Sequence, residues 1–416
     1  MNIFDKVLDI YQNYYICPYC LGRLFALLGT NTTNYERGTS LLLSMTLENH
    51  REYLSGKEER VEGALHALKI LTEKVRFIPA QKVLKAEGIE FSEGNVSNPC
   101  YLCQDIFSKL QEYVETAKNE IKNIEFNTLL VGTSINSLII NNEDKFKSEF
   151  NLLEAESFKN HFNREVGKRL SLQLNKPTEF NYPDLLIIYS LSFTEVSIEL
   201  IIRSIFIYGR YNKLIRGIPQ THWPCNKCSG RGCKECGFTG KQYLTSVEEL
   251  ISPEFVSETM ASSSKFHGAG REDIDVRMLG SGRPFIIELR NPKIRNIDLN
   301  KIKKRVNKSN KNKVRIQELK YSEKKEVINI KAGAENSRKV YKVTGETSEK
   351  FTKEEFKKKL EIVKLRIENH KIKQQTPIRV SHRRVDKIRT KLIYGVEGKF
   401  IKKNLLPMFH GFSLIL

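Results

Sequence analysis

The eight cysteines of this chain form four Cys-x-x-Cys pairs, with no cysteine left over. They are Cys17 and Cys20, Cys100 and Cys103, Cys225 and Cys228, and Cys233 and Cys236. A Cys-x-x-Cys turn directs two thiolates at one ion, and two such turns complete the four sulfur ligands of a structural zinc site. A single pair could instead be a redox dithiol or a local disulfide, but four complete pairs favour two zinc sites.

The spacing of the pairs assigns them to these two sites. The last two pairs lie so close together that their four ligands can share one ion, as a compact zinc knuckle. The first two pairs are far apart, so an ion shared by them would close the whole N-terminal module. Structural zinc contributes about 10–16 kcal/mol in small peptides, which is enough to decide whether that module folds. Four sulfur ligands leave no open position for a substrate, so we expect both ions to be structural.

A second candidate for chemistry is the polar segment 266–277, which reads FHGAGREDIDVR and continues as MLGSGRPF. It places three acids and two arginines between glycines. In one interpretation the acids simply pair with Arg271 and Arg277 in a polar turn. In the other, one carboxylate is a nucleophile, kept ionised by a neighbouring guanidinium that lowers its pKa. The spacing alone leaves both open, and the Gly-x-Gly around Ser281 is a weak phosphate-binding signal because Pro284 disfavours a following helix.

The charge balance favours a polyanionic partner. Lys and Arg outnumber Asp and Glu by 69 to 49, giving a net charge of +20, and neutralising phosphates releases condensed counterions. A general preference for lysine on solvated faces is the alternative. Eight Lys or Arg and no acid lie within 301–315, which we expect to be a mobile basic loop that grips a phosphate backbone. The basic segment 353–373 is expected to be an exposed helix.

The remaining pattern predicts a multidomain α+β protein. Residues 1–15 read as an amphipathic helix and not as a signal peptide, and the apolar runs fall short of the ~20 residues of a membrane span. We therefore expect a soluble cytoplasmic protein, where reduced thiols can bind zinc. The chain to about residue 90 is expected to be helical. Further on, the periodicity predicts helices over Phe107–Glu120 and Phe146–Leu172, strands over Asn127–Ser134, Asp184–Ser192 and Glu195–Tyr208, and a basic connector over Tyr208–Pro219.

The segment 270–277, GREDIDVR, resembles the signature loop of pseudouridine synthases, which share an Arg-x-Asp element. The longer string through Phe285 resembles one branch, the archaeal and eukaryotic tRNA pseudouridine synthases that act on uridines 54 and 55 of the TΨC arm. That branch has an N-terminal module with two distant Cys-x-x-Cys pairs and a THUMP-like RNA-binding domain. Segments matching its other motifs are Tyr208–Cys225, Ser246–Ile251, Lys339–Tyr341 and Ser381–Tyr394.

The resemblance implies roles for particular residues. Asp273 would be the nucleophile, because it stands two residues after Arg271, and Asp275 is the rival in the same loop. Arg271 would hold Asp273 or replace the flipped base in the RNA stack. Tyr341 would stack on the target uracil, and Arg277 and Arg283 would contact the substrate.

The resemblance also implies an organisation. Residues 1–104 would form the helical zinc module, 105–212 the THUMP-like domain, and 213–416 a catalytic domain with a mainly antiparallel mixed sheet. The expected partner is tRNA. No organic cofactor, membrane or obligatory protein partner is expected, and zinc is the expected metal.

The leading alternative is a non-catalytic, zinc-stabilised tRNA-binding protein or chaperone. It is kept because the branch normally carries a Gly-Arg-Thr-x-Pro run near its end, whereas this chain reads GVEGKFIKKNLLPMFHGFSLIL after Tyr394. A THUMP-associated methyltransferase or thiolation enzyme would need a cofactor loop or a P-loop-like motif, which the sequence lacks. A redox role for the cysteine pairs is a further alternative. The pattern leaves open the oligomeric state and whether uridine 54, 55 or both are modified.

Overall fold

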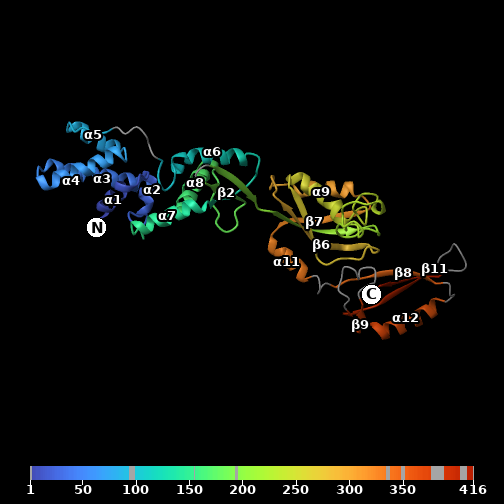
Figure 1. Cartoon of the computed structure of the whole chain (residues 1–416). Coiled ribbons are helices and arrows are strands. Elements are labelled where there is room, and N and C mark those ends of the chain that lie inside the picture. The colour runs from blue at the N-terminus through green and yellow to red at the C-terminus, as the bar shows by residue number, and fades with distance from the viewer. Residues whose placement is uncertain are drawn as a thin grey trace. The chain divides into compact units, whose positions relative to one another are not determined.

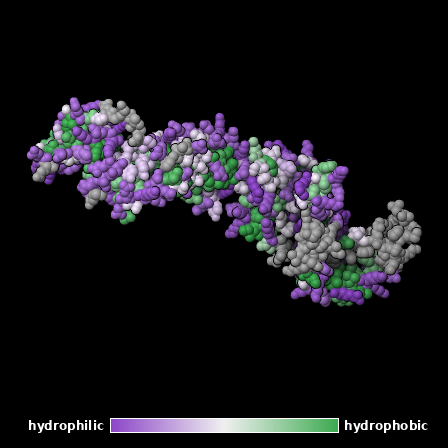
Figure 2. Space-filling view, viewed as in Figure 1, coloured by the Kyte–Doolittle hydropathy of each residue, from purple (hydrophilic) through white to green (hydrophobic). Residues whose placement is uncertain are grey.

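The computed structural model describes residues 2–92, 99–153, 155–192, 195–333, 338–347, 352–375, 388–402 and 410–415. The chain divides into two compact units, Met1–Ala332 and Gly333–Leu416 (Figure 1). Helices and antiparallel sheets are both present, which confirms the predicted α+β class. Hydrophilic residues cover much of the face seen in Figure 2, with smaller hydrophobic patches between them. Within the described ranges, no helix has the length and apolar character needed to cross a membrane.

The N-terminal part of the first unit is helical, as predicted. Its helices are α1 (Ile3–Asn13), α2 (Pro18–Leu24), α3 (Asn34–Leu54), α4 (Glu58–Glu73) and α5 (Ile78–Ala86). The α2 helix begins directly after Cys17, with Pro18 in its first turn, where the missing N–H costs nothing. It touches α3 backbone to backbone, because a Cβ on Gly22 would lie 1.7 Å from the Asn34 carbonyl oxygen.

A small sheet and its helices follow. The elements are η1 (Ile106–Lys109), α6 (Leu110–Ile121), β1 (Leu129–Ile135), α7 (Ser137–Glu149), α8 (Phe158–Leu174), β2 (Leu185–Leu191) and β3 (Val196–Ile202). In this sheet β1 runs parallel to β2, and β2 runs antiparallel to β3. Side chains of this sheet share one buried core with the N-terminal helices, so these two parts fold together.

The single helix predicted over Phe146–Leu172 is wrong, because the structure has α7 and α8 there. Asn151 takes a left-handed φ of 46°, which a continuing helix does not allow. Ser157 then caps α8 by accepting from the Asn160 N–H, and Glu143 of α7 accepts from the Phe158 N–H. The apolar periodicity continues across this break and therefore conceals it.

The second sheet carries the candidate loop. Its strands are β4 (Ile205–Lys213), β5 (Ser263–Gly268), β6 (Met278–Arg290) and β7 (Val314–Ser322), in the order β5-β6-β4-β7 and all antiparallel. The short η2 (Lys234–Cys236) lies in the cysteine-rich segment between β4 and β5. Helices α9 (Val247–Thr259) and α10 (Leu299–Ser309) pack apolar side chains into the core of this sheet.

The strand predicted over Glu195–Tyr208 proves to be two strands in different sheets. The β2–β3 ladder ends where the Arg203 N–H donates to the Asp184 carbonyl, and β4 then pairs with β6. Residues 205–212, which the sequence pattern placed with the second region, therefore belong to the sheet of the third. The first half of the predicted connector Tyr208–Pro219 also belongs to β4, which is an inner strand of this sheet.

The basic segment 301–315 is not the mobile loop that we expected. It forms most of α10 and the start of β7. Asp298 caps the helix by accepting from the Asn300 and Lys301 N–H groups. Ile302 and Val306, four residues apart, are fully buried, so the lysines occupy the remaining faces.

The second unit follows α11 (Lys324–Gly333). Its elements are β8 (Lys342–Thr347), α12 (Lys353–Ile367), β9 (Lys371–Gln374), β10 (Arg389–Leu392), β11 (Glu397–Lys402) and β12 (His410–Ile415). One antiparallel sheet has the order β11-β12-β8, and β9 pairs with β10. The exposed helix predicted over 353–373 is confirmed as far as Ile367, as α12, which buries Phe356 and leaves Leu365 79% exposed, whereas residues 371–373 belong to β9. Residues 381–387 of the predicted arginine-rich strand lie outside the described residues.

Candidate functional site

Both four-cysteine groupings are confirmed by the positions of the sulfur atoms. In each group the four Sγ atoms lie within 4.8 Å of one another, and all eight cysteines are free thiols. Cys17 and Cys103 Sγ are 3.7 Å apart, and Cys225 and Cys233 Sγ are 4.0 Å apart. Zinc–sulfur bonds of about 2.3 Å in a tetrahedron place the sulfurs about 3.8 Å apart. The geometry therefore suits a tetrahedral metal ion at each group.

Backbone N–H groups in the Cys225–Cys236 cluster are directed at the sulfurs. Gly232 N lies 3.2 Å from Cys228 Sγ, and Gly240 N lies 3.3 Å from Cys236 Sγ. The Cys233 N–H, with other hydrogen bonds, lowers the pKa of Cys236 to about 6. Hydrogen bonds of this kind stabilise thiolates, which are the form that binds metal.

The loop 269–277 connects β5 to β6, and its underside is held by Lys213 of β4. This side chain is fully buried. Its Nζ donates to the carbonyl oxygens of Ile218 at 3.1 Å, Asp273 at 2.9 Å and Ile274 at 3.1 Å. The pKa of Lys213 is lowered, mainly because the side chain is buried. The nearby carboxylates, of which Glu272 has the largest effect, partly oppose this shift. One ammonium group thus fixes the backbone on both sides of the Asp273 peptide.

Replacing Lys213 by methionine should release the loop. Three carbonyl oxygens would lose their shared donor, which we expect to cost about 2–4 kcal/mol of unfolding free energy. The exposed Lys265 on β5 provides the matched control, Lys265→Met, which should change stability by less than about 0.5 kcal/mol. Denaturant unfolding of both variants measures the difference, and equal stabilities would contradict this role of Lys213.

Glu272 points inward and closes a buried polar network. The Tyr211 hydroxyl donates to Glu272 Oε2 at 2.7 Å, and Arg283 Nε lies 2.9 Å from the same oxygen. Gln220 Nε2 donates to the Tyr211 hydroxyl at 2.9 Å and to the Gly270 carbonyl at 3.0 Å. Burial, followed by the Glu272 carboxylate, raises the pKa of Tyr211 well above its usual value. Tyr211 therefore remains a protonated donor at neutral pH.

The residues expected to do chemistry lie on the outer side of the same loop. Glu272 and Ile274 are buried, whereas Arg271, Asp273 and Asp275 alternate with them and are exposed. Asp273 Oδ1 accepts from the Ile274 N–H at 2.8 Å. The alternation lets the loop be anchored through every second residue while it presents the Arg-x-Asp element outward.

The other predicted site residues are placed differently. Arg277 is exposed at the end of the loop. Arg283 is 7% exposed, and its Nη1 donates to the Ala269 carbonyl at 2.7 Å, so it braces the loop from below. Tyr341 belongs to the second unit, where it directly precedes β8 and is 53% exposed.

Sequence reasoning missed Tyr211, Lys213 and Gln220. Tyr211 and Lys213 lie in the segment assigned to the connector, and Gln220 directly follows it, although the tyrosines of this segment are typical of strands. No spacing rule links β4 to a loop sixty residues later, so only the sheet pairing brings these residues under Asp273.

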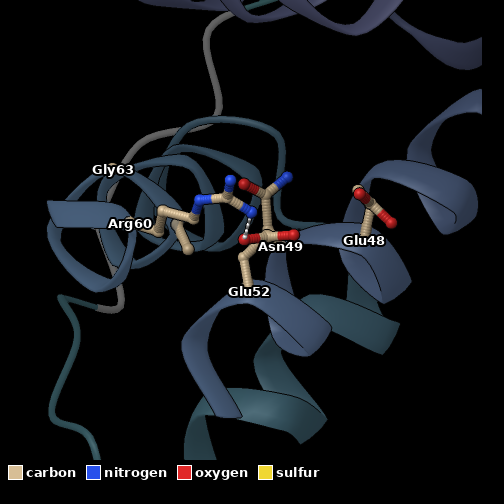
Figure 3. Close-up of a pocket in the computed structure, with 6 residues that line it drawn as sticks. Glu48, Asn49, Glu52, Arg60 and Gly63 are labelled. Carbon is tan, nitrogen blue, oxygen red and sulfur yellow. Dashed lines mark hydrogen bonds and ion pairs between the residues drawn. The ribbon is translucent and has the colours of Figure 1, made fainter. Parts of the chain in front are cut away.

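A separate pocket of about 350 Å³ lies between α3 and α4, distant in sequence from this loop. Figure 3 shows Arg60 reaching toward Glu52, whose Oε2 accepts from Arg60 Nη1 at 3.1 Å. Glu48 also lines the pocket. The two carboxylates disfavour a polyanion there, and none of the residues predicted to do chemistry takes part.

Comparison with known proteins agrees with these features. Residues 206–409 match the family model described as "Pus10, C-terminal", and residues 113–190 match "Pus10 THUMP domain, archaeal". Several relatives carry the name tRNA pseudouridine synthase Pus10. The protein from Methanocaldococcus jannaschii is 40% identical over 96% of this chain and 84% of its own length. Those from Methanothrix thermoacetophila and Methanopyrus kandleri are 39% and 37% identical, over 92% and 96% of this chain and 79% and 86% of their own lengths.

The resemblance noted from the loop motif is thereby confirmed over most of the chain. The family models cover the segment with the candidate loop, the second group of cysteines and strands β1 and β2 of the small sheet, and the relative from Methanocaldococcus jannaschii aligns with 96% of the chain. This chain belongs to the Pus10 family of tRNA pseudouridine synthases.

Proposed function

We propose that this protein isomerises uridine to pseudouridine at position 54, position 55 or both in the TΨC loop of tRNA, with Asp273 as the nucleophile. The observation that carries the proposal is that the loop is anchored on its inner side and leaves Asp273 exposed on its outer side. Lys213 and Glu272 fix its backbone from inside, and Asp273 is left exposed outside. A nucleophile held in this way approaches its target with little conformational freedom to lose.

The chemistry follows from the position of the carboxylate. A uridine in a folded loop must first be extruded, at a cost of a few kcal/mol. The Asp273 carboxylate then attacks C1′ or assists cleavage there, and the N-glycosidic bond breaks. The uracil rotates, C5 bonds to C1′, and the proton on C5 is released to solvent. A carbon–carbon bond replaces a carbon–nitrogen bond, so the reaction needs no oxidant, reductant or energy source.

The remaining site residues support this step. Arg271 would occupy the space left by the extruded base, and Tyr341 would stack on the uracil. Arg277 is exposed and suited to a phosphate, whereas the buried pairing of Arg283 with Glu272 suits a positioning role. Zinc is the metal that we assign to both cysteine clusters, because four thiolates in a tetrahedron are its preferred structural ligands.

We propose three domains, which would contact different parts of the tRNA. We assign residues 1–104 to the zinc module, 105–212 to the THUMP domain and 213–416 to the catalytic domain, with strand β4 contributed to the catalytic sheet. Thiolate ligands require a reducing compartment, which is consistent with the cytoplasm.

The mapping of modified positions tests the proposal. The purified protein would be incubated with unmodified tRNA transcripts carrying uridine or cytidine at positions 54 and 55. Pseudouridine confined to these two positions is expected, and each substitution should remove the signal only at its own position. Modification elsewhere would contradict the assigned position, and tight binding without any modification would favour the non-catalytic tRNA-binding alternative.

The basic helix α10 should contribute to tRNA affinity. Lys304 and Lys308 are exposed on it, away from the buried Ile302 and Val306. Their replacement by glutamate should weaken tRNA binding about tenfold or more, and should reduce the slope of log K against log salt by about 1.8. The control replaces two other exposed lysines by glutamate, Lys57 directly before α4 and Lys82 in α5, for the same change in net charge. Equal losses in both variants would mean that only net charge matters.

A further inference from the structure

The only tryptophan of the chain connects the second cysteine cluster with the catalytic loop. Trp223 is 3% exposed, and the Arg271 guanidinium carbon lies 4.4 Å from the centroid of its indole ring. We propose that Trp223 is a positioning residue that holds Arg271 over the face of its ring, and that the metal-bound knuckle holds Trp223 in turn. The inference rests on the proposed function and adds to it a route by which a structural metal supports the active loop.

The knuckle holds Trp223 through hydrogen bonds at its base. The Trp223 carbonyl accepts from the Gln242 N–H at 2.9 Å, and the Cys225 N–H donates to the Gly240 carbonyl at 2.7 Å. Gly240 in turn donates its N–H to Cys236 Sγ at 3.3 Å. Loss of the metal would release the Cys236 side chain. The hydrogen bonds that connect Trp223 to Gln242 and Cys225 to Gly240 would then no longer be held in place by the cluster.

The indole itself has one defined orientation. The Tyr243 ring packs against it in a T-shaped arrangement, with the ring centroids 5.5 Å apart and the planes at 82°. One face of the indole is presented to Arg271. A ring held in this way offers a stable surface for a cation.

Arg271 is the part of the loop that most needs such support. Its neighbours are fixed, because Gly270 accepts from Gln220 and Glu272 is buried. The Arg271 side chain has many rotamers and is exposed, and ordering it costs conformational entropy. Contact with the indole reduces that cost before the RNA arrives, so the guanidinium is already ordered when the loop meets its substrate.

A double-mutant cycle tests the positioning role. Trp223→Leu should lower kcat about 3- to 30-fold, the range that corresponds to one cation–π contact, with an unchanged KM and two metal ions per chain. Trp223→Phe retains an aromatic face and should recover most of the loss. Because Trp223 acts through Arg271, the double variant Trp223→Leu/Arg271→Met should be no slower than Arg271→Met alone. Losses that multiply in the double variant would overturn the positioning role.

Intrinsic fluorescence supplies a readout that needs no activity, because Trp223 is the sole tryptophan. Without RNA, Arg271→Met and Cys236→Ser should each raise the acrylamide quenching constant about twofold or more, since each uncovers or loosens the indole. Unchanged quenching in Arg271→Met would overturn the contact, and unchanged quenching in Cys236→Ser would overturn its dependence on the metal. If wild type forms no pseudouridine but both variants change the quenching, the proposed function fails and the structural coupling stands.

Discussion

Replacing Asp273 by asparagine should abolish pseudouridine formation and leave tRNA binding intact. Asparagine has nearly the same shape, and its carbonyl oxygen can still accept from the Ile274 N–H, as Asp273 Oδ1 does at 2.8 Å. The loop anchors, Lys213 and Glu272, are unaffected. What is lost is the charged oxygen that attacks C1′. The loss of a nucleophile lowers kcat by about four orders of magnitude or more.

Asp275→Asn is the matched control. Asp275 is exposed on the same outer side of the loop and carries the same charge, so its variant reproduces the electrostatic change without removing the proposed nucleophile. We expect a loss of less than about tenfold, as for a neighbouring charge acting through solvent. Single-turnover rates with saturating enzyme compare the two variants. A large loss of activity in Asp275→Asn, together with an active Asp273→Asn, would mean that Asp275 and not Asp273 is the nucleophile.

Replacing Cys100 by serine should unfold the N-terminal helical module. Cys20, Cys100 and Cys103 are buried in the same core as α1 and α2, and the cluster ties the start of α2 to a segment some eighty residues later. The metal contributes about 10 kcal/mol or more in comparable sites, which exceeds the whole stability of many domains. We expect one metal ion per chain instead of two, and rapid proteolysis of the N-terminal helices and of the small sheet that shares their core.

The charge near this cluster strengthens the expectation. Arg23 is fully buried beside it and forms an ion pair with Glu143 of α7. Burial alone would lower the pKa of Arg23, but the Cys20 thiolate and the Glu143 carboxylate raise it above its usual value. A buried cation is therefore balanced in part by thiolates, and loss of the metal would disturb this balance as well.

Cys236→Ser serves as the comparison for the metal. The Cys236 side chain is only partly buried, and the hydrophobic cluster of the second sheet contains no cysteine. This variant should also lose one metal ion, but the unfolding transition of the N-terminal module should remain. If Cys100→Ser were as stable as wild type, the apolar core alone would suffice and the structural role of the first metal would be refuted.

Local signals in the sequence predicted much of this molecule. The cysteine spacing identified both clusters, because a Cys-x-x-Cys turn is a short-range geometry. The strand predicted over 127–134 is confirmed as β1, and the α+β class was confirmed. The Arg271–Asp273 element could be recognised because it is contiguous in the chain, although the roles of these residues stay predictions.

Features that depend on the tertiary structure could not be predicted in this way. Lys213 and Tyr211 reach the loop only because β4 pairs with β6. The break between α7 and α8 depends on a left-handed residue within a continuous apolar pattern. In 301–315 the density of lysines suggested a loop, but two buried apolar residues four positions apart and an Asp298 cap were enough to form a helix.

The most direct test of the central claim is the release of tritium from tRNA transcripts labelled at C5 of uridine. Forming the bond between C5 and C1′ expels the label to water, so release measures the isomerisation itself. We predict stoichiometric release by the wild-type protein and none by Asp273→Asn, with equal tRNA binding by both. Binding without release by the wild-type protein, or full release by Asp273→Asn, would contradict the account.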